Sequence, residues 1–96
     1  MKLQMIGCSH HDAAVEFRER VAFSGDQVDT ALGDFCRRFP KGELVLLSTC
    51  NRTELYTTTD DDTSLDREAV IGFLAEQHQL STDVVVEQMI YRSGHD

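Results

Sequence analysis

A short break, Pro40-Lys41-Gly42, separates two stretches whose apolar residues repeat with different periods. Before the break, the apolar residues of segment 26–39 fall three or four positions apart and therefore lie on one face of a helix. After it, every residue from 44 to 47 is apolar, which is typical of a strand covered on both faces or placed centrally in a sheet. A helix that ends at this break and a strand that follows it predict a domain of mixed α and β structure.

The other segments extend this alternation of strands and helices. Residues 3–9 are short and apolar and predict a first strand, and residues 54–58 and 90–92 predict two more. Helices are predicted over 15–23 and 65–80, whereas residues 84–89 fit either a helix or a strand. Ser24 lies three residues before Gln27, which is the spacing of a capping box, and Thr63 or Ser64 would cap the helix over 65–80.

This order of elements is that of a ferredoxin-like split βαβ sandwich, an α+β fold with a four-stranded antiparallel sheet and helices on one face. Ninety-six residues suffice for one domain with one modest core. We expect that core to contain apolar residues of the two longer helices, namely Val28, Leu32, Phe35, Val70, Phe73 and Leu74.

The composition favours a protein of the cytoplasm. No apolar run approaches the roughly 18 residues needed to cross a bilayer, and the first residues lack the long apolar core of a secretory signal. Three cysteines, an odd number without a Cys-x-x-Cys pair, argue against both a disulfide framework and a zinc site.

The charge of the chain argues against nucleic acid as a partner of this segment taken alone. Seventeen acidic residues outnumber nine basic ones, for a formal net charge of −8, and affinity for a polyanion comes mostly from cationic side chains. The clusters Arg18/Arg20 and Arg37/Arg38 are interpreted as solvated helix faces. The polar stretch 57–64, with its three aspartates, is interpreted as a solvent-facing turn rather than a metal site.

The most unusual segment follows the apolar strand, and it places Cys50 where a buried strand ends. The four polar residues after this cysteine favour a tight bend. Two interpretations remain open. A free cysteine is usually a small core hydrophobe, which is the interpretation adopted for Cys8 and Cys36. Alternatively, Arg52 favours the thiolate of Cys50, which is the nucleophilic form, rather than forming only a surface ion pair with Glu54.

The string Ser48-Thr49-Cys50-Asn51-Arg52-Thr53-Glu54, followed by Tyr56, resembles the catalytic signature of the glutamyl-tRNA reductase family. A second block, GCSHHDAAVEFRERVAF over residues 7–23, is similar to the opening of that family. The resemblance covers the whole chain, but the chain would be only the opening part of the family enzyme. It implies an incomplete N-terminal catalytic domain over residues 1–96, without the NADPH-binding and helical dimerisation domains.

The resemblance implies the NADPH-dependent reduction of glutamyl-tRNA to glutamate-1-semialdehyde, the first step of tetrapyrrole (porphyrin) biosynthesis. Cys50 would attack the aminoacyl ester, release the tRNA and hold glutamate as a thioester, and hydride from NADPH would then release the aldehyde. No Gly-x-Gly-x-x-Gly occurs in the sequence, so NADPH is expected to bind in a domain absent from this chain. The 96 residues alone are expected to reduce nothing.

Residue roles follow from the same resemblance. The positions that match substrate-binding residues are Thr49, Cys50, Asn51 and Arg52. Arg52 would hold the γ-carboxylate of the substrate in a two-point fork, a geometry that lysine does not offer. Glu54 is expected to orient Arg52 without touching the substrate. His10 also matches the family pattern, and it either supports the site or only bonds the backbone at a strand end.

The implied partners are glutamyl-tRNA, the downstream glutamate-1-semialdehyde aminomutase and, for the full enzyme, a second copy of itself. The isolated chain is expected to be a monomer, because the dimer contacts of the family belong to the helical domain, and no membrane partner is expected. One alternative from another class stays open: a small acidic ferredoxin-like regulatory or protein-interaction domain whose cysteine is structural.

Overall fold

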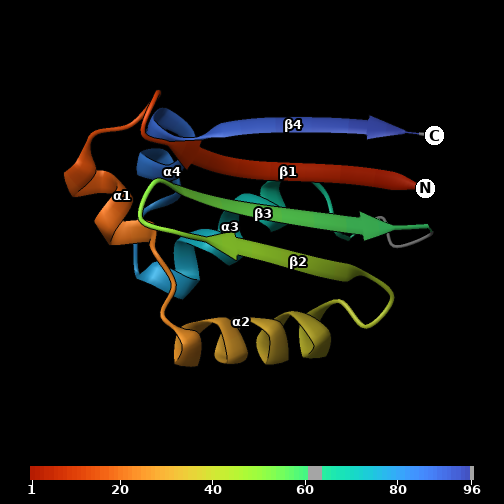
Figure 1. Cartoon of the computed structure of the whole chain (residues 1–96). Helices are drawn as coiled ribbons and strands as arrows, with labels where there is room; N and C mark the ends of the chain where they lie inside the picture. The colour runs from red at the N-terminus through yellow and green to blue at the C-terminus, as the bar shows by residue number, and fades with distance from the viewer. Residues whose placement is uncertain (61–63, 96) are drawn as a thin grey trace.

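The computed structural model of the chain describes residues 1–60 and 64–95 (Figure 1). The elements in these residues are, in chain order, β1 (Lys2–Ser9), α1 (Val15–Val21), α2 (Gly25–Arg38), β2 (Glu43–Ser48), β3 (Arg52–Thr59), α3 (Arg67–His78), α4 (Thr82–Gln88) and β4 (Ile90–His95). The four strands form one antiparallel sheet in the order β2-β3-β1-β4. The predicted α+β class, with its four-stranded antiparallel sheet, is therefore confirmed.

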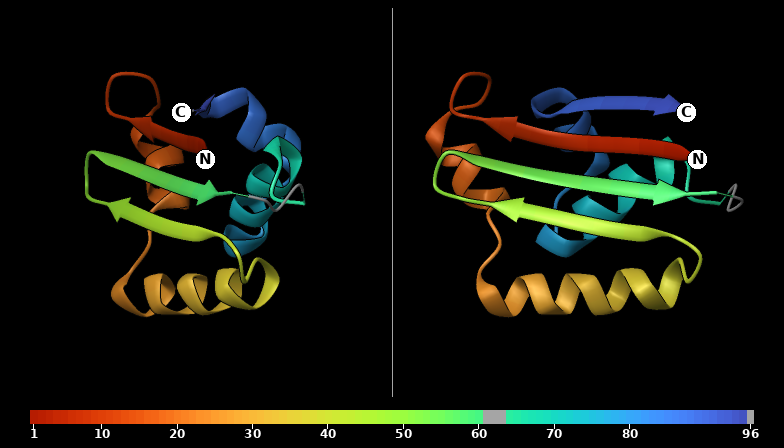
Figure 2. Two further views of the ribbon diagram at one scale, coloured as in Figure 1. Left: turned by 90° about the vertical axis from the view of Figure 1, so that its right-hand side faces the viewer. Right: turned by 45° about the vertical axis from the view of Figure 1, so that its right-hand side comes forward.

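The sheet has one face against the helices and one open face. In the left view of Figure 2 the sheet is seen nearly on edge, with α3 and α4 on one side of it. Along β3 the buried side chains alternate with more exposed ones, so that Thr53, Leu55 and Thr57 lie on the helix side. The open side carries Val45 and Leu47, which are 64% and 41% exposed. This period of two is what a half-covered antiparallel sheet dictates.

Helix α2 begins at the predicted capping box. The Ser24 hydroxyl accepts a hydrogen bond from the Gln27 backbone N–H, and the Gln27 side chain accepts one from the Ser24 N–H. Two orphan N–H groups of the first turn are thereby satisfied. The helix buries Ala31 and Phe35, and Val28 packs partly buried against the core.

The core lies between the helices and the covered face of the sheet. The Phe35 and Phe73 rings meet edge to face, with 5.5 Å between centroids and 85° between planes, which is a favoured aromatic geometry. Leu74 is fully buried beside them. The predicted core residues are confirmed at these three positions and at Val70, whereas Leu32 is only half-buried.

Cys36 is exposed, so the prediction that it lies in the core is wrong. Successive helix residues are turned by about 100°, and Phe35 points to the centre of the buried stripe of α2. Cys36, the next residue, therefore lies beyond the edge of that stripe. The apolar character of a cysteine alone did not distinguish the edge of the stripe from its centre.

Helix α3 begins later than predicted and has a different cap. Its N-cap is Asp66, whose carboxylate accepts a hydrogen bond of 2.9 Å from the Ala69 N–H, so the predicted cap at Ser64 is wrong. Leu65 precedes the helix, is 1% exposed, and accepts a hydrogen bond of 2.7 Å from the Gln4 amide. The other predicted cap, Thr63, lies outside the described residues, as do two of the three aspartates of the polar loop.

The ambiguous segment near the C-terminal end is helical. It forms α4, whose N-cap Ser81 accepts a hydrogen bond from the Val84 N–H, and β4 then runs on to His95. Within residues 1–60 and 64–95, no helix is long and apolar enough to span a bilayer. In the same ranges no group of three or more His, Cys, Asp or Glu side chains could hold a metal ion.

Candidate functional site

Cys50 lies on the short turn between β2 and β3. Strand β2 ends at Ser48, strand β3 begins at Arg52, and Ser48 pairs with Thr53. The prediction that the four polar residues after Cys50 form a bend is therefore wrong for three of them, which already belong to β3. Their polarity follows the period of the strand instead. Thr53 is buried on the helix side, whereas Arg52 and Glu54 lie on the open side.

Thr49 closes the turn from within. Its backbone N–H donates to the Arg52 carbonyl at 2.8 Å. Its hydroxyl accepts hydrogen bonds from the Asn51 and Arg52 N–H groups, each at 3.2 Å. A side-chain hydroxyl that binds nearby backbone amides is a recurrent way to fix a tight turn. A hydroxyl that accepts these two bonds can still donate its own proton to one further acceptor.

Two other segments hold the turn from outside. The His10 backbone N–H donates to the Asn51 carbonyl at 2.8 Å, and the Arg18 guanidinium donates to the Cys50 carbonyl at 3.1 Å. His10 follows β1 and Arg18 lies on α1, so both motifs that the sequence singled out meet at this turn. The backbone on either side of the Cys50 side chain is thus fixed by hydrogen bonds from three parts of the chain.

The three thiols have different surroundings. Cys50 is exposed at the tip of the turn, so the interpretation of it as a core residue is wrong. Cys8 is 3% exposed, and its burial, with the Asp12 carboxylate as a smaller cause, raises the pKa of its thiol. Cys8 is therefore the core cysteine that the sequence predicted. Cys36 is exposed on α2 and lies on a different element from the turn.

Arg52 and Glu54 form an ion pair beside the turn, with 3.7 Å between Nη1 and Oε1. Their side chains are 53% and 21% exposed, so the guanidinium reaches solvent while the carboxylate is more enclosed. Glu54 also lies near Tyr56, and desolvation together with that carboxylate raises the pKa of the Tyr56 phenol. This ion pair agrees with the expectation that Glu54 orients Arg52. That role of Glu54 stays a prediction.

Glycine is required opposite Glu54. Gly7 of β1 pairs with Glu54 of β3, and a Cβ on Gly7 would lie 2.7 Å from the Thr53 carbonyl oxygen and 3.0 Å from Glu54 Cγ. Contacts this short are incompatible with a side chain. The absence of a Cβ on Gly7 therefore gives the Glu54 side chain the space that it occupies next to Arg52.

His10 contacts the turn through its backbone. Its side chain is exposed, and its ring lies 3.9 Å, centroid to centroid, from the ring of His11. The backbone bond to Asn51 agrees with the interpretation of a histidine that supports the end of a strand. A direct role of the imidazole stays a prediction.

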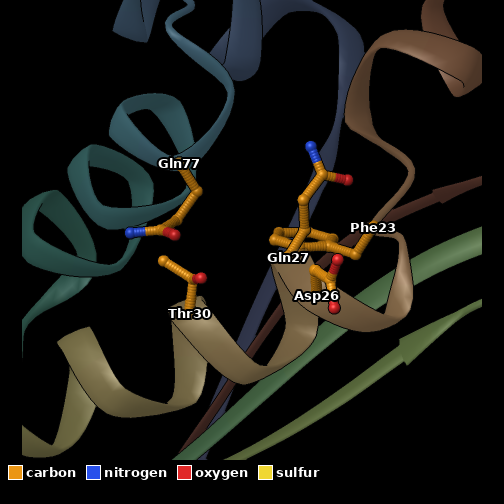
Figure 3. Close-up of a pocket in the computed structure, with 5 residues that line it drawn as sticks. All are labelled: Phe23, Asp26, Gln27, Thr30 and Gln77. Carbon is orange, nitrogen blue, oxygen red and sulfur yellow. The ribbon is translucent and has the colours of Figure 1, made fainter.

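A separate hollow of about 150 Å³ lies between α2 and α3, away from the residues predicted to form the site (Figure 3). In Figure 3, Gln77 of α3 faces Thr30 of α2 across this hollow. Its other lining residues are Phe23, Asp26 and Gln27. The structure thus places the predicted site residues on and beside an exposed hairpin turn, apart from this hollow.

Sequence reasoning missed Arg18. It was interpreted as part of a solvated helix face, but its guanidinium bonds a carbonyl 32 positions along the chain. The signal available in the sequence was that Arg18 belongs to one of the two distinctive motifs and Cys50 to the other.

The fold and the turn define a class: an α+β domain that presents a thiol on a hydrogen-bonded hairpin turn, next to an arginine–glutamate pair. Comparisons with known proteins identify the family. The family described as glutamyl-tRNA(Glu) reductase, N-terminal domain, matches residues 6–96. The glutamyl-tRNA reductase of Rhodopirellula baltica is 46% identical over 96 residues, which cover 100% of this chain and 22% of that protein. That of Shewanella sediminis is 46% identical over 92 residues, covering 96% and 21% respectively.

A solved structure agrees with these relatives. Glutamyl-tRNA reductase from Methanopyrus kandleri is similar with a TM-score of 0.62 and 27% identity, covering 96% of this chain and 19% of that one. The chain belongs to the glutamyl-tRNA reductase family and corresponds to its N-terminal domain. It spans about a fifth of the length of the curated relatives that it matches.

Proposed function

We propose that this chain is the catalytic, acyl-capturing domain of an NADPH-dependent glutamyl-tRNA reductase, which makes glutamate-1-semialdehyde at the start of tetrapyrrole (porphyrin) biosynthesis. One observation carries the proposal: the thiol of Cys50 is exposed on a turn whose backbone is fixed on both sides, in a chain of this family. An exposed thiol on a rigid support can reach an ester on a substrate as large as a tRNA.

The chemistry proposed for Cys50 is an acyl transfer. The thiolate attacks the carbonyl carbon of the ester that joins glutamate to the tRNA, and a carbon–sulfur bond forms. The ester carbon–oxygen bond breaks, and the ribose oxygen of the tRNA leaves and takes up a proton. The product is a glutamyl thioester on Cys50, which divides one difficult reduction into two easier steps.

Recognition of the substrate is assigned to Arg52. The α-carboxyl group of glutamate is consumed in the ester, so the γ-carboxylate is the only anion of the amino acid left to bind. The half-exposed guanidinium of Arg52 can take this carboxylate in a two-point fork, while Glu54 at 3.7 Å fixes its orientation. Asn51 and the Thr49 hydroxyl lie on the same turn and supply further polar contacts to the substrate.

Reduction of the thioester needs hydride from NADPH, and the residues of this chain do not fit that cofactor. A dinucleotide is held by a glycine-rich turn between a strand and the helix that follows it. Here Gly7 and Gly94 lie within strands, Gly33 and Gly72 lie within helices, and none of the six glycines has a positive φ. The roles proposed for these 96 residues are therefore limited to acyl capture and substrate recognition.

The test uses a chimera in which these 96 residues replace the aligned residues of the Rhodopirellula baltica enzyme. Cys50→Ser should abolish NADPH-dependent reduction of glutamyl-tRNA, because a serine hydroxyl lacks the nucleophilicity of a thiolate. Cys36→Ser is the matched control, since it removes the other exposed thiol and should leave the rate unchanged. Near-normal reduction by the Cys50→Ser chimera would refute the proposal.

Arg52→Lys in the same chimera tests the assignment of the γ-carboxylate. Lysine keeps the positive charge but loses the fork, and we expect a loss of about 2 to 4 kcal/mol in transition-state stabilisation, on the order of 10² to 10³ in kcat/KM. A kcat/KM for Arg52→Lys within about twofold of the parent chimera would contradict the two-point contact.

The open face of the sheet favours a second candidate, a protein-interaction domain. Leu3, Val45 and Leu47 are exposed there, and a hollow of about 230 Å³ is lined by Met5 and Tyr56 among others. Exposed apolar patches mark interaction surfaces more often than scattered apolar residues do. This candidate does not explain why the turn around Cys50 is so closely hydrogen-bonded, so we place it second.

The proposal also covers the compartment, the oligomeric state and the partner enzyme of the whole reductase. The parent reductase would act in the cytoplasm as a homodimer and would pass its reactive aldehyde to glutamate-1-semialdehyde aminomutase. Light scattering on the 96-residue chain should find a monomer, because the dimer contacts are assigned to the helical domain. A stable dimer of the 96-residue chain would contradict that assignment.

A further inference from the structure

Arg18 connects helix α1 to the turn that carries Cys50. Its Nε donates to the Ala13 carbonyl at 3.3 Å and its Nη1 donates to the Cys50 carbonyl at 3.1 Å. Phe17 and Val21 on the same helix are buried, so the position of α1 against the domain is fixed by packing. The guanidinium therefore bridges two carbonyls that are 37 positions apart in sequence, one before its helix and one on the turn.

The bond to the Cys50 carbonyl fixes the peptide unit between Cys50 and Asn51. The next carbonyl along, that of Asn51, is held by the His10 N–H. On the other side of Cys50, the Thr49 N–H donates to the Arg52 carbonyl. Because each peptide unit is planar and rigid, bonds that hold the backbone before and after Cys50 together restrict the direction of its Cα–Cβ bond relative to the sheet. Figure 1 shows α1 beside the end of the sheet where β2 turns into β3.

We propose that Arg18 is a positioning residue for Cys50: through the Cys50 carbonyl it directs the thiol toward the substrate ester, and its positive charge is held at the backbone of the residue that bears the thiol. This inference rests on the proposed function of Cys50 as the nucleophile. Arginine suits the role because Nε and Nη1 donate in two fixed directions within one plane, whereas lysine has a single nitrogen at the end of a flexible stem.

The first experiment measures the alkylation rate of each cysteine in the 96-residue chain by mass spectrometry, with iodoacetamide as a neutral reagent and iodoacetate as an anionic one. The variants are Arg18→Ala, Arg18→Lys and the matched control Arg20→Ala. Arg20 is an exposed arginine on the same helix, and no hydrogen bond or ion pair of its side chain is found within the described residues. Cys36 is the internal reference.

In Arg18→Ala the iodoacetate rate at Cys50 should fall about threefold to tenfold, because the cation bound to the Cys50 carbonyl is lost. The iodoacetamide rate should fall less. Arg18→Lys should restore the iodoacetate rate, and Arg20→Ala should change nothing. Cys8 reports on folding, since a variant that keeps its core keeps Cys8 protected. If Cys8 becomes reactive in Arg18→Ala, that variant has lost its core, and the inference is then tested by the kcat of the Arg18→Lys chimera relative to the parent chimera in the second experiment.

The second experiment measures kcat and KM in the chimeric reductase. A misaimed nucleophile lowers kcat about tenfold to a hundredfold in Arg18→Ala and at least about fivefold in Arg18→Lys, with KM for glutamyl-tRNA within about threefold. If Arg18 only stabilised the fold, its variants would not show a lower kcat together with a nearly unchanged KM. Equal kcat in the Arg18→Lys and parent chimeras, or equal Cys50 alkylation in Arg18→Ala and Arg20→Ala, would overturn the inference. Failure of the proposed function itself is a different result, namely an active Cys50→Ser chimera.

Discussion

Replacing Gly7 with alanine tests how closely β1 and β3 approach next to the site. The added Cβ would lie 2.7 Å from the Thr53 carbonyl oxygen, 3.0 Å from Glu54 Cγ and 3.2 Å from Glu54 Cα. Two of these three atoms belong to the backbone of β3, so rotation of a side chain cannot relieve the contacts. The two central strands of the sheet must move apart instead.

The expected change in the free energy of unfolding of Gly7→Ala is the sum of two opposing effects. Overpacking of this kind costs about 1 to 3 kcal/mol, whereas alanine in a strand is favoured over glycine by about 0.5 to 1 kcal/mol. We expect Gly7→Ala to lower the free energy of unfolding by about 1 to 2 kcal/mol. Gly94→Ala is the matched control, because Gly94 lies in β4 and a Cβ there would meet nothing within 4 Å.

The assay is urea denaturation of the 96-residue chain followed by circular dichroism. With a slope of about 1 to 2 kcal/mol per molar urea, the Gly7→Ala midpoint should fall by about 1 M. The Gly94→Ala midpoint should stay the same or rise. A Gly7→Ala midpoint equal to or above that of Gly94→Ala would show that β3 yields at little energetic cost, and the steric account of Gly7 would be wrong.

Three further predictions concern single side chains. The Thr57 hydroxyl is buried without a hydrogen-bond partner among the described residues, so Thr57→Val should raise the free energy of unfolding by about 1 kcal/mol in urea denaturation; a loss of stability would indicate a partner. Burial lowers the pKa of His78, so the unfolded chain binds the proton first as the pH falls below about 6.5, and stability is lost there. The parent chain should therefore lose more stability than His78→Gln between about pH 7.5 and pH 5.5, and equal losses would contradict this. Native alkylation should label Cys36 and Cys50 but not Cys8, and mass spectrometry showing three labels without denaturant would place Cys8 outside the core.

Local patterns in the sequence predicted the structure best. The Ser24–Gln27 capping box needs only two residues at a fixed spacing, and it was found as predicted. The start of α3 was predicted too early because Leu65 is apolar and adjoins a helical pattern. Leu65 is buried, but as an anchor before the helix whose carbonyl is held by Gln4 from β1. That contact joins residues 61 positions apart, which a local pattern does not contain.

At the candidate site, too, the features set by local sequence were predictable, whereas those set by contacts between distant residues were not. The position of Cys50 just after an apolar strand was predictable, because the strand is a continuous run. The extension of β3 back to Arg52 was not, since polar residues in succession look like a loop unless one side of the strand is known to be open. The link from Arg18 to Cys50 depends on how α1 packs, which only the tertiary structure fixes.

The pairing of β1 with β4 places the two ends of the described chain side by side, with Lys2 opposite His95 (Figure 1). Folding must therefore close a loop of almost the whole chain, which costs about 4 kcal/mol of chain entropy by the logarithmic dependence on loop length. A short peptide joining the two ends would remove most of that entropy from the unfolded state. The same proximity allows circular permutation, with new ends opened at Lys41 between α2 and β2, so the β2–β3 hairpin and its thiol could be carried near the start of a rearranged polypeptide.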